Sequence, residues 1–279
     1  MEIGCRREAR YQYKVQGITV SKVLAIANQK GGVGKTTTSV NLAASLSVTR
    51  NRVLLIDMDP QGNATMGSGV DKNGLEYSIY DLLTDLADFA SVVKRSDGEY
   101  DLIPANGDLV SAEVELISLE NRELRLRNII EAIREHYDFI VIDCPPALSM
   151  LTINSLVAAD GVVIPMQCEY YALEGLSALM DTIRAIQDRI NPTLKIEGIL
   201  RTMYDPRNKL TSEVNGQLFN YFGDAVYRTV VPRNIRLAEA PSYGKPVIKY
   251  DRKSRGAIAY LALAGEMMRR HDESVRVIQ

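Results

Sequence analysis

Residues 27–38 read ANQKGGVGKTTT, and this stretch decides the fold. It follows a short apolar run, KVLAIAN (22–28), and it overlaps the start of a segment with helical spacing at 35–48. A glycine-rich turn between a strand and a helix, ending in lysine and threonine, is typical of a phosphate-binding loop. The glycines let backbone N–H groups approach phosphate oxygens, and the helix N-terminus adds about half a positive charge. The sequence therefore predicts a nucleotide site on a strand–loop–helix unit.

The residues of this loop have distinct expected roles. The ammonium of Lys35 is expected on the β and γ phosphates, and the Thr36 hydroxyl is expected to bind Mg²⁺. A second lysine, Lys30, precedes Lys35 by five residues, and a phosphate loop by itself needs only one. The predicted nucleotide-binding residues are Lys30, Gly31, Gly32, Val33, Gly34, Lys35, Thr36 and Thr37.

Aspartates end two further apolar runs. Asp143 closes FIVID (139–143), the Walker B pattern, and we expect it to hold Mg²⁺ through water. Asp57 and Asp59 follow LLI in LLIDMDPQGN, and strand alternation places them on one face. Asp59 lies further out, so we expect it to orient the attacking water or accept its proton. Asp57 is predicted near the Mg²⁺ shell.

Short Val/Ile-rich runs alternate with helical segments along the chain. This alternation predicts an α/β fold with a doubly wound, mostly parallel sheet flanked by helices. With the phosphate loop, the expected fold is the P-loop NTPase fold. Ligands of such a sheet bind beyond the carboxyl ends of its strands, where these motifs fall. We expect a flexible arm at 1–21, a single ATPase domain at 22–270 and a polar tail at 271–279. The predicted strands are 22–28, 52–59, 137–144, 160–166, 194–204 and 225–232, and the predicted helices are 35–48, 111–135, 150–158, 172–189, 211–222 and 255–270.

Composition excludes several classes of protein. The net charge of −2 gives no indication of a nucleic-acid or acidic-membrane partner. The three cysteines are widely spaced and odd in number, so a disulfide framework, a zinc site or an iron–sulfur site is not expected. No apolar run is long enough for a membrane helix, and the N-terminus has no secretory pattern, which favours a cytoplasmic protein. We interpret His136 and His271 as ordinary surface residues, Cys144 as a small core residue and the pair Tyr170-Tyr171 as packing.

Five motifs together resemble one known group of proteins. KGGVGKTT, with its extra lysine, is similar to the deviant Walker A motif of the ParA/MinD ATPases, and four more motifs resemble the ParA/Soj partition branch. The resemblance covers about residues 22–268. The four further motifs are DMDPQGNAT (57–65), VIDCPP (141–146), IPMQCEYYALEGL (164–176) and VVPRNIRLAEAPSYGKPV (230–247).

The resemblance implies an ATP-dependent dimer switch. Two protomers would enclose two ATP molecules, and Lys30 would reach the phosphates of the partner's ATP, in a role like that of an arginine finger. Asp59 matches the residue needed for hydrolysis, so Lys30, Lys35 and Asp59 form the predicted catalytic set. A ParB-like centromere-binding partner would stimulate slow hydrolysis and reset the dimer.

The resemblance also implies an adenine loop and a DNA-binding surface. Pro232 and Asn234 match the segment beside the adenine, and Arg207 and Arg236 match positions implicated in nonspecific double-stranded DNA binding. Arg233, within the same loop, is grouped with these arginines. The segment 201–255 holds eleven Lys/Arg and five Asp/Glu, a net charge of +6, which leaves about −8 for the rest of the chain. Such segregation suits a phosphate-backbone footprint and a nucleoid-associated protein.

Three alternatives remain open. A MinD-type membrane-associated division-site regulator would need a C-terminal amphipathic helix, whereas this chain ends in a polar, mixed-charge stretch, so no membrane partner is expected. A metallocluster-linked relative would need suitably placed cysteines. An ATP-bound scaffold without hydrolysis would not need to retain Thr36, Asp59 and Asp143.

Overall fold

The computed structural model describes residues 21–169 and 172–278. The predicted N-terminal arm, apart from Ser21, and the pair Tyr170-Tyr171 lie outside this part of the chain. One eight-stranded sheet organises the described residues, with the strand order β3-β4-β2-β5-β1-β6-β7-β8. Neighbouring strands pair in parallel except β3 and β4, which are antiparallel. The strands are β1 (Lys22–Ile26), β2 (Val53–Asp57), β3 (Lys94–Arg95), β4 (Asp101–Ile103), β5 (Phe139–Asp143), β6 (Gly161–Gln167), β7 (Lys195–Tyr204) and β8 (Val226–Pro232).

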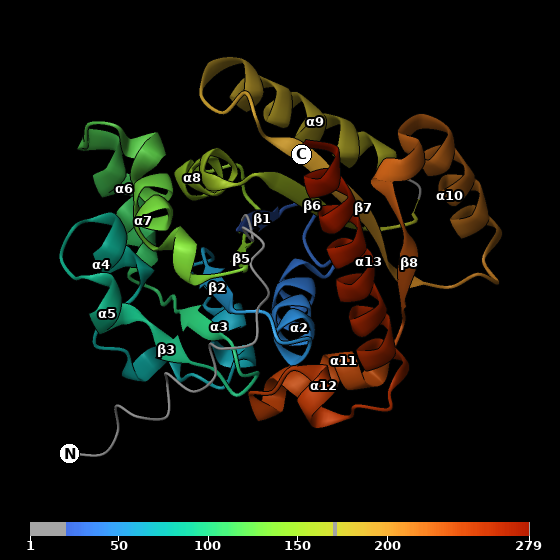
Figure 1. Ribbon diagram of the computed structural model, residues 1–279, viewed down its shortest axis with the longest axis horizontal. Coiled ribbons are helices and arrows are strands. Elements are labelled where there is room, and N and C mark those ends of the chain that lie inside the picture. The colour runs from blue at the N-terminus through green and yellow to red at the C-terminus, as the bar shows by residue number, and fades with distance from the viewer. Residues whose placement is uncertain (1–20, 170–171, 279) are drawn as a thin grey trace.

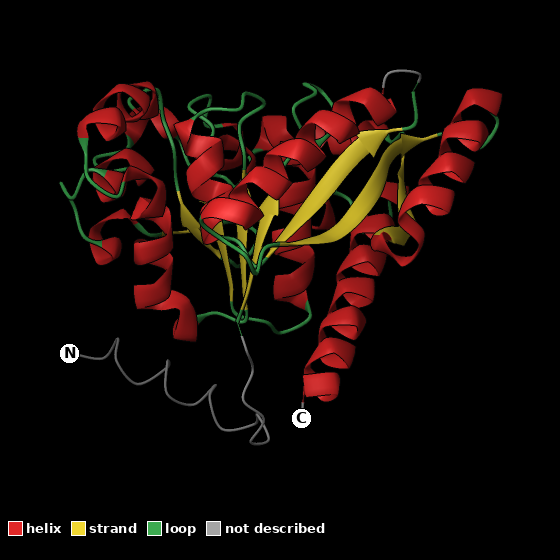
Figure 2. Ribbon diagram, turned by 90° about the horizontal axis from the view of Figure 1, so that it is seen from above, coloured by secondary structure: helices red, strands yellow, loops and turns green. Residues whose placement is uncertain are grey.

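The sheet is buried on both faces, as its continuous apolar strands require. Alternate residues of each central strand enter different cores: Val23 and Ala25 of β1 face one, and Leu24 and Ile26 face the other. The second core is closed by α2 (Lys35–Val48) and α13 (Arg255–Ile278), while helices α6 to α10 supply the first. Figures 1 and 2 show helices on both sides of the twisted sheet. The predicted doubly wound α/β fold is confirmed.

The remaining helices connect the strands or extend these layers. They are α3 (Asn63–Gly67), α4 (Ile79–Leu83), α5 (Phe89–Val92), α6 (Leu109–Ser118), α7 (Arg125–Ile133), α8 (Met150–Ala158), α9 (Ala172–Arg189), α10 (Lys209–Phe222), α11 (Ile235–Glu239) and α12 (Val247–Tyr250). Short 3₁₀ turns are η1 (Lys72–Gly74), η2 (Arg122–Leu124), η3 (Arg134–His136), η4 (Gly223–Ala225) and η5 (Ala240–Tyr243). The six predicted strands are all present, and the helices predicted at 35–48, 150–158 and 172–189 have the predicted bounds.

The single helix predicted at 111–135 is wrong. The chain forms α6, leaves the helical conformation after Ser118, and starts again with η2 and α7. α6 ends because Leu119 is extended, with φ −87° and ψ 143°. Asn121 then adopts a left-handed conformation with φ 52° at the start of η2, a region that asparagine tolerates. The side chain of Asn154, on α8, then accepts the Leu126 N–H at 3.1 Å and so caps α7 from a distant part of the chain.

The last helix is longer than predicted. α13 continues to Ile278, so the helix end predicted at residue 270 is wrong, and the segment predicted as a polar tail is helical as far as Ile278. His271 is not an ordinary surface residue, because its ring packs against Phe139 with centroids 5.8 Å apart. His136 is exposed as predicted. The strands β3 and β4 were not predicted, since they are only two and three residues long.

The register of the sheet brings the predicted site residues to one edge. Ile26 at the end of β1 pairs with Asp143, and Asp143 pairs with Asp57 at the end of β2. On the other side of β1, β7 and β8 end together, with Tyr204 paired to Pro232. The phosphate loop, Asp57, Asp143 and the start of the loop after β8 therefore lie beyond the carboxyl ends of the parallel strands.

Candidate phosphate-binding site

The loop between β1 and α2 has the backbone geometry of an anion cradle. Gly32 and Gly34 adopt positive φ values of 74° and 89°, a region that residues with a Cβ atom enter only at a cost. Gly34 caps α2 without a side-chain hydrogen bond, so the first N–H groups of this 14-residue helix remain available to a ligand. A Cβ atom added at Gly31 or Gly32 would meet nothing within 4 Å. There is room for phosphate against this backbone.

Distant residues hold the loop in place. The Thr202 hydroxyl, from β7, donates to the Val33 carbonyl at 2.7 Å, and both residues are buried. The hydroxyls of Thr38 and Tyr260 lie 3.1 Å apart and join α2 to α13. Sequence reasoning missed both anchors, because nothing near Thr202 or Tyr260 in the chain marks them as partners of the loop.

Lys35 is positioned inside the loop. Lys35 is 7% exposed, and its ammonium donates to the Lys30 carbonyl at 3.2 Å. Burial lowers the pKa of Lys35, while the charges of Asp143 and Asp59 oppose this shift. A buried ammonium attracts a phosphate more strongly than a solvated ammonium does, because the local dielectric is low.

Lys30 takes a different direction from Lys35. Its ammonium pairs with the Glu169 carboxylate at 2.7 Å, on the loop after β6, and the two side chains are 40% and 48% exposed. The Lys30 N–H donates to the Asn28 side chain at 2.9 Å, and Asn28 itself donates to the Pro165 carbonyl at 2.8 Å. The second lysine is therefore held at the surface beside the loop, on a well-anchored backbone.

Asp143 is a buried carboxylate with one unsatisfied oxygen. Ser39 of α2 donates to its Oδ1 at 2.7 Å, whereas Oδ2 is buried and has no hydrogen-bond partner among the described residues. Burial, followed by the charge of Asp57, raises the pKa of Asp143 to about 8, and the nearby hydroxyls of Ser39 and Thr36 offset this only in part. An orphaned carboxylate oxygen near Thr36 fits a hydrated Mg²⁺ ion.

Asp57 is buried and already hydrogen-bonded. Its Oδ2 accepts from both the N–H and the hydroxyl of Thr65 at 2.8 Å, and its Oδ1 accepts the Asp59 N–H at 3.1 Å. Burial raises the pKa of Asp57 to about 6. These contacts favour a supporting role, in which Asp57 shapes the loop that carries Asp59, and its predicted place near Mg²⁺ stays a prediction.

Asp59 lies in the turn that follows β2. Its Oδ1 accepts the Gln61 N–H at 2.9 Å, and no hydrogen bond reaches Oδ2 from the residues that the structure describes. Asp59 is 9% exposed and close enough to Lys35 and Asp143 for its charge to raise the pKa of both. One carboxylate oxygen thus remains available near the phosphate loop.

The metal-binding groups at this edge are few. Within residues 21–169 and 172–278, no group of three or more His, Cys, Asp or Glu side chains is arranged to hold a metal ion. A divalent cation at this edge would therefore need oxygens from a nucleotide, together with Thr36 and water on Asp143. This arrangement suits Mg²⁺, which keeps several waters and shares phosphate oxygens. Cys144 lies in the core as predicted, and burial raises the pKa of its thiol to about 12.

The predicted adenine loop follows β8. Pro232 is half-buried beside the end of β7, and the Asn234 Oδ1 atom is buried without a hydrogen-bond partner among the described residues. An amide oxygen in this state can accept an exocyclic amino group of a base.

The predicted DNA-binding arginines fall in two places. Arg207 is 88% exposed and pairs with Asp205 at 2.8 Å, and the charge of Arg233 also reaches Asp205. Arg236, on α11, pairs with Glu239 at 2.8 Å and with Asp251 at 3.4 Å.

One residue counted in the basic segment does not belong to its surface. Arg201 is only 5% exposed, and it donates to the carbonyls of Tyr227 and Arg228 and to Asn215. It therefore supports β7 and β8 from inside the fold.

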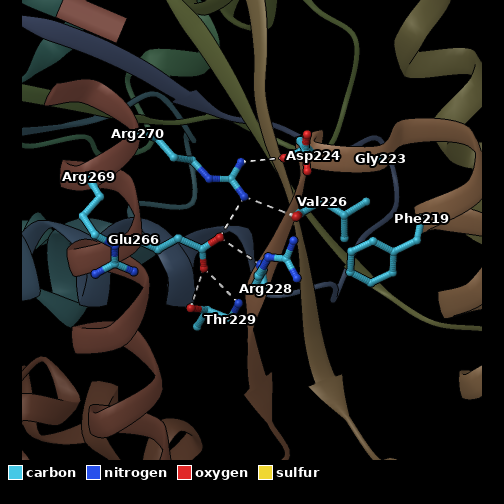
Figure 3. Close-up of a pocket in the computed structure, with 9 residues that line it drawn as sticks. All are labelled: Phe219, Gly223, Asp224, Val226, Arg228, Thr229, Glu266, Arg269 and Arg270. Carbon is cyan, nitrogen blue, oxygen red and sulfur yellow. Dashed lines mark hydrogen bonds and ion pairs between the residues drawn. The ribbon is translucent and has the colours of Figure 1, made fainter. Parts of the chain in front are cut away.

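A pocket lies at the outer edge of β8, away from the phosphate loop (Figure 3). Glu266 of α13 accepts the N–H groups of Arg228 and Thr229 at 2.9 Å, and Arg270 donates to the Val226 carbonyl at 3.3 Å. The Arg270 guanidinium also pairs with Glu266 at 2.7 Å. Glu266 and Arg270 thus hydrogen-bond to backbone groups that an edge strand would otherwise expose. These contacts block pairing of β8 with a strand of another chain.

Comparison with known proteins identifies the family. The model of the family described as AAA domain matches residues 21–196. An uncharacterized protein of Pseudomonas putida is 63% identical over 93% of this chain and 99% of its own. The sporulation initiation inhibitor protein Soj of Bacillus subtilis is 55% identical over 89% of this chain and 98% of its own. The chain belongs to the Soj/ParA family of chromosome-partitioning ATPases. The motif resemblance found in the sequence is confirmed.

A solved structure shows the same fold as this Soj/ParA chain. Cobyrinic acid a,c-diamide synthase from Mycobacterium smegmatis, with bound ADP and magnesium, superposes with a TM-score of 0.81. It is 36% identical, and the match covers 91% of this chain and 96% of that one. None of the helices described for the Soj/ParA chain has the length and apolarity that crossing a membrane requires.

Proposed function

We propose that this chain is a DNA-partition ATPase that binds ATP and Mg²⁺ and acts as a nucleotide-sandwich dimer. Lys35, Thr36 and the glycine loop would hold the triphosphate, and Asp143 would hold Mg²⁺ through water. Asp59 would align the attacking water with its available carboxylate oxygen. The buried, unpartnered amide oxygen of Asn234 supports placing the adenine beside the loop after β8.

The position of Lys30 carries this proposal. Lys35 already supplies the ammonium inside the loop, whereas the Lys30 side chain lies 40% exposed against Glu169. A second positive charge at the rim adds little to the protomer's own site, but it can reach a triphosphate on a facing protomer. In that position Lys30 would neutralise charge that only the assembled dimer encloses.

The dimer would bind DNA nonspecifically through the basic surface that includes Arg207, Arg233 and Arg236. Arg207 and Arg236 pair with carboxylates in the free protein, so the salt bridges must exchange for phosphate contacts, and we expect weak binding by the monomer. Two copies of the surface in a dimer would raise the avidity without a new contact. A ParB-like partner would stimulate hydrolysis and release the dimer from the nucleoid.

Two variants test this function. With ATP and Mg²⁺, Lys30→Gln should lose both dimerisation, measured by analytical ultracentrifugation, and DNA binding, measured by fluorescence anisotropy. Asp59→Ala should keep both but fail to hydrolyse ATP. An ATP-dependent dimer of Lys30→Gln with wild-type affinity would refute the role of Lys30 in trans. Binding to anionic vesicles in place of DNA would favour a MinD-type membrane regulator.

A further inference from the structure

The outer face of α6 carries an exposed aliphatic stripe. Val110, Val114 and Ile117 are 56%, 70% and 60% exposed, although aliphatic side chains of this size are usually buried. Their spacing of four and three residues places them on one side of the helix. The opposite side of the helix packs into the core, where Leu109, Ala112 and Leu116 are fully buried. α6 is therefore apolar on two faces, and only one of them has a partner within the described chain.

The surroundings of this stripe are acidic. Asp108, Glu113, Glu115 and Glu120 lie on α6 or directly beside its ends, and no lysine or arginine occurs between Arg95 and Arg122. The wider segment 81–123 holds eleven Asp/Glu and three Lys/Arg, a net charge of −8. The acidic excess of the chain is thus concentrated in this segment, although Glu99 and Asp101 are paired with Lys249 and Arg95.

The fold places α6 far from Arg207, although the two charged segments meet elsewhere, where Lys249 pairs with Glu99 at 2.7 Å. Strands β3 and β4 form one edge of the sheet, and β7 and β8 form the other. Figure 1 shows α4 to α6 at the first edge and α10 with β8 at the opposite end of the molecule. A nucleic acid bound near Arg207 would therefore lie at the other end of the molecule from α6.

We propose that the α6 stripe is a docking surface for a basic amphipathic helix of another protein. Aliphatic anchors on that helix would cover Val110, Val114 and Ile117, and its lysines or arginines would face the carboxylates around them. This is helix-on-helix recognition, in which spacing sets the register and charge sets the partner. The acidic rim disfavours an anionic membrane or a nucleic acid as the occupant.

The surface does not use the phosphate loop, so this inference stands apart from the proposed ATPase cycle. Docking should occur on the monomer, without nucleotide, and should be unchanged by Lys30→Gln. The α6 stripe can therefore connect a partner to the ATPase in either nucleotide state. Failure of the trans-lysine proposal would leave this surface intact.

A synthetic peptide tests the surface directly. The probe is a fluorescent 14-residue amphipathic helix built from leucine and lysine, and the readout is fluorescence anisotropy. We expect Val114→Ser/Ile117→Ser to weaken binding at least about tenfold, since most of the apolar contact is lost. Ile258→Ser is the matched control, because Ile258 is an aliphatic residue on α13 with 57% exposure, and it should bind the peptide as the wild type does.

A second peptide experiment tests the charge requirement. A leucine–glutamate peptide of the same pattern should not bind, and Glu113→Gln/Glu120→Gln should weaken the lysine peptide about three- to tenfold at low salt. Circular dichroism and the melting temperature verify that each variant is folded; the substituted side chains are exposed or half-buried, so folding should persist.

Three results would overturn the proposal. Equal peptide affinity for the wild type and the Val114→Ser/Ile117→Ser variant would show that the stripe is not the site. A nucleotide-free dimer that this variant abolishes would make a second copy of the chain the occupant. Binding to phosphatidylcholine vesicles that depends on the stripe would make it a lipid contact.

Discussion

Replacing Glu169 by glutamine should strengthen the ATP-dependent dimer. In the free protein, Lys30 pairs with Glu169 at 2.7 Å, and this pair must break before Lys30 can reach the facing nucleotide. Both side chains are 40% or more exposed, so each pair contributes only about 0.2–1 kcal/mol to the monomer. Two pairs break in each dimer, which gives about 0.4–2 kcal/mol, or a dimer dissociation constant about two- to thirtyfold lower for the variant.

The dimer constant can be measured by sedimentation equilibrium with ATP and Mg²⁺, in the Asp59→Ala background to prevent turnover. Glu174→Gln is the matched control, because it removes the same charge from an exposed position of nearby α9. The difference between the variants should shrink at high ionic strength, since the lost pair is solvent-exposed. Weaker dimerisation by Glu169→Gln, or an equal gain in Glu174→Gln, would refute the reasoning.

Three further predictions concern the loop, the metal and the sheet edge. Thr202→Val removes the hydrogen bond to the Val33 carbonyl and leaves a buried acceptor, so nucleotide affinity by calorimetry should fall about tenfold, while Thr202→Ser should stay near wild type. Removing Mg²⁺ with EDTA should weaken ATP binding by the wild type. Asp143→Ala should lower the Mg²⁺ affinity about 10- to 100-fold by titration, so EDTA should have little effect on ATP binding by this variant. Glu266→Ala should lower the free energy of unfolding in urea by about 3 kcal/mol, because two backbone N–H groups lose a charged acceptor. Burial opposes ionisation of Glu266, but hydrogen bonds led by the Thr229 hydroxyl hold its pKa below the usual value, so this stabilisation is present at neutral pH and lost as pH falls through that pKa. Glu266→Gln should show a weaker loss on acidification than the wild type.

The sequence by itself determined the sheet and the identity of the loop residues. Continuous Val/Ile runs can only be buried on both faces, so their alternation with helical segments predicted the doubly wound fold and all six longer strands. The glycines, Lys35 and Thr36 identified the phosphate loop because the motif is local, and each residue acts through its own backbone or side chain.

Tertiary structure decided how those residues are held. α6 and α7 are separate because the chain is extended at Leu119 and Asn154, from α8, caps the second helix. No local pattern predicts a cap that comes from another element. The hydrogen bonds from Thr202 to the phosphate loop and from Thr65 to the Asp57 carboxylate also join different elements, so no local pattern predicts them. Only the tertiary structure shows that the β3–β4 and β7–β8 ends of the sheet are opposite edges, while Lys249 still reaches Glu99, because the distance between two segments in space does not depend on their separation in the chain.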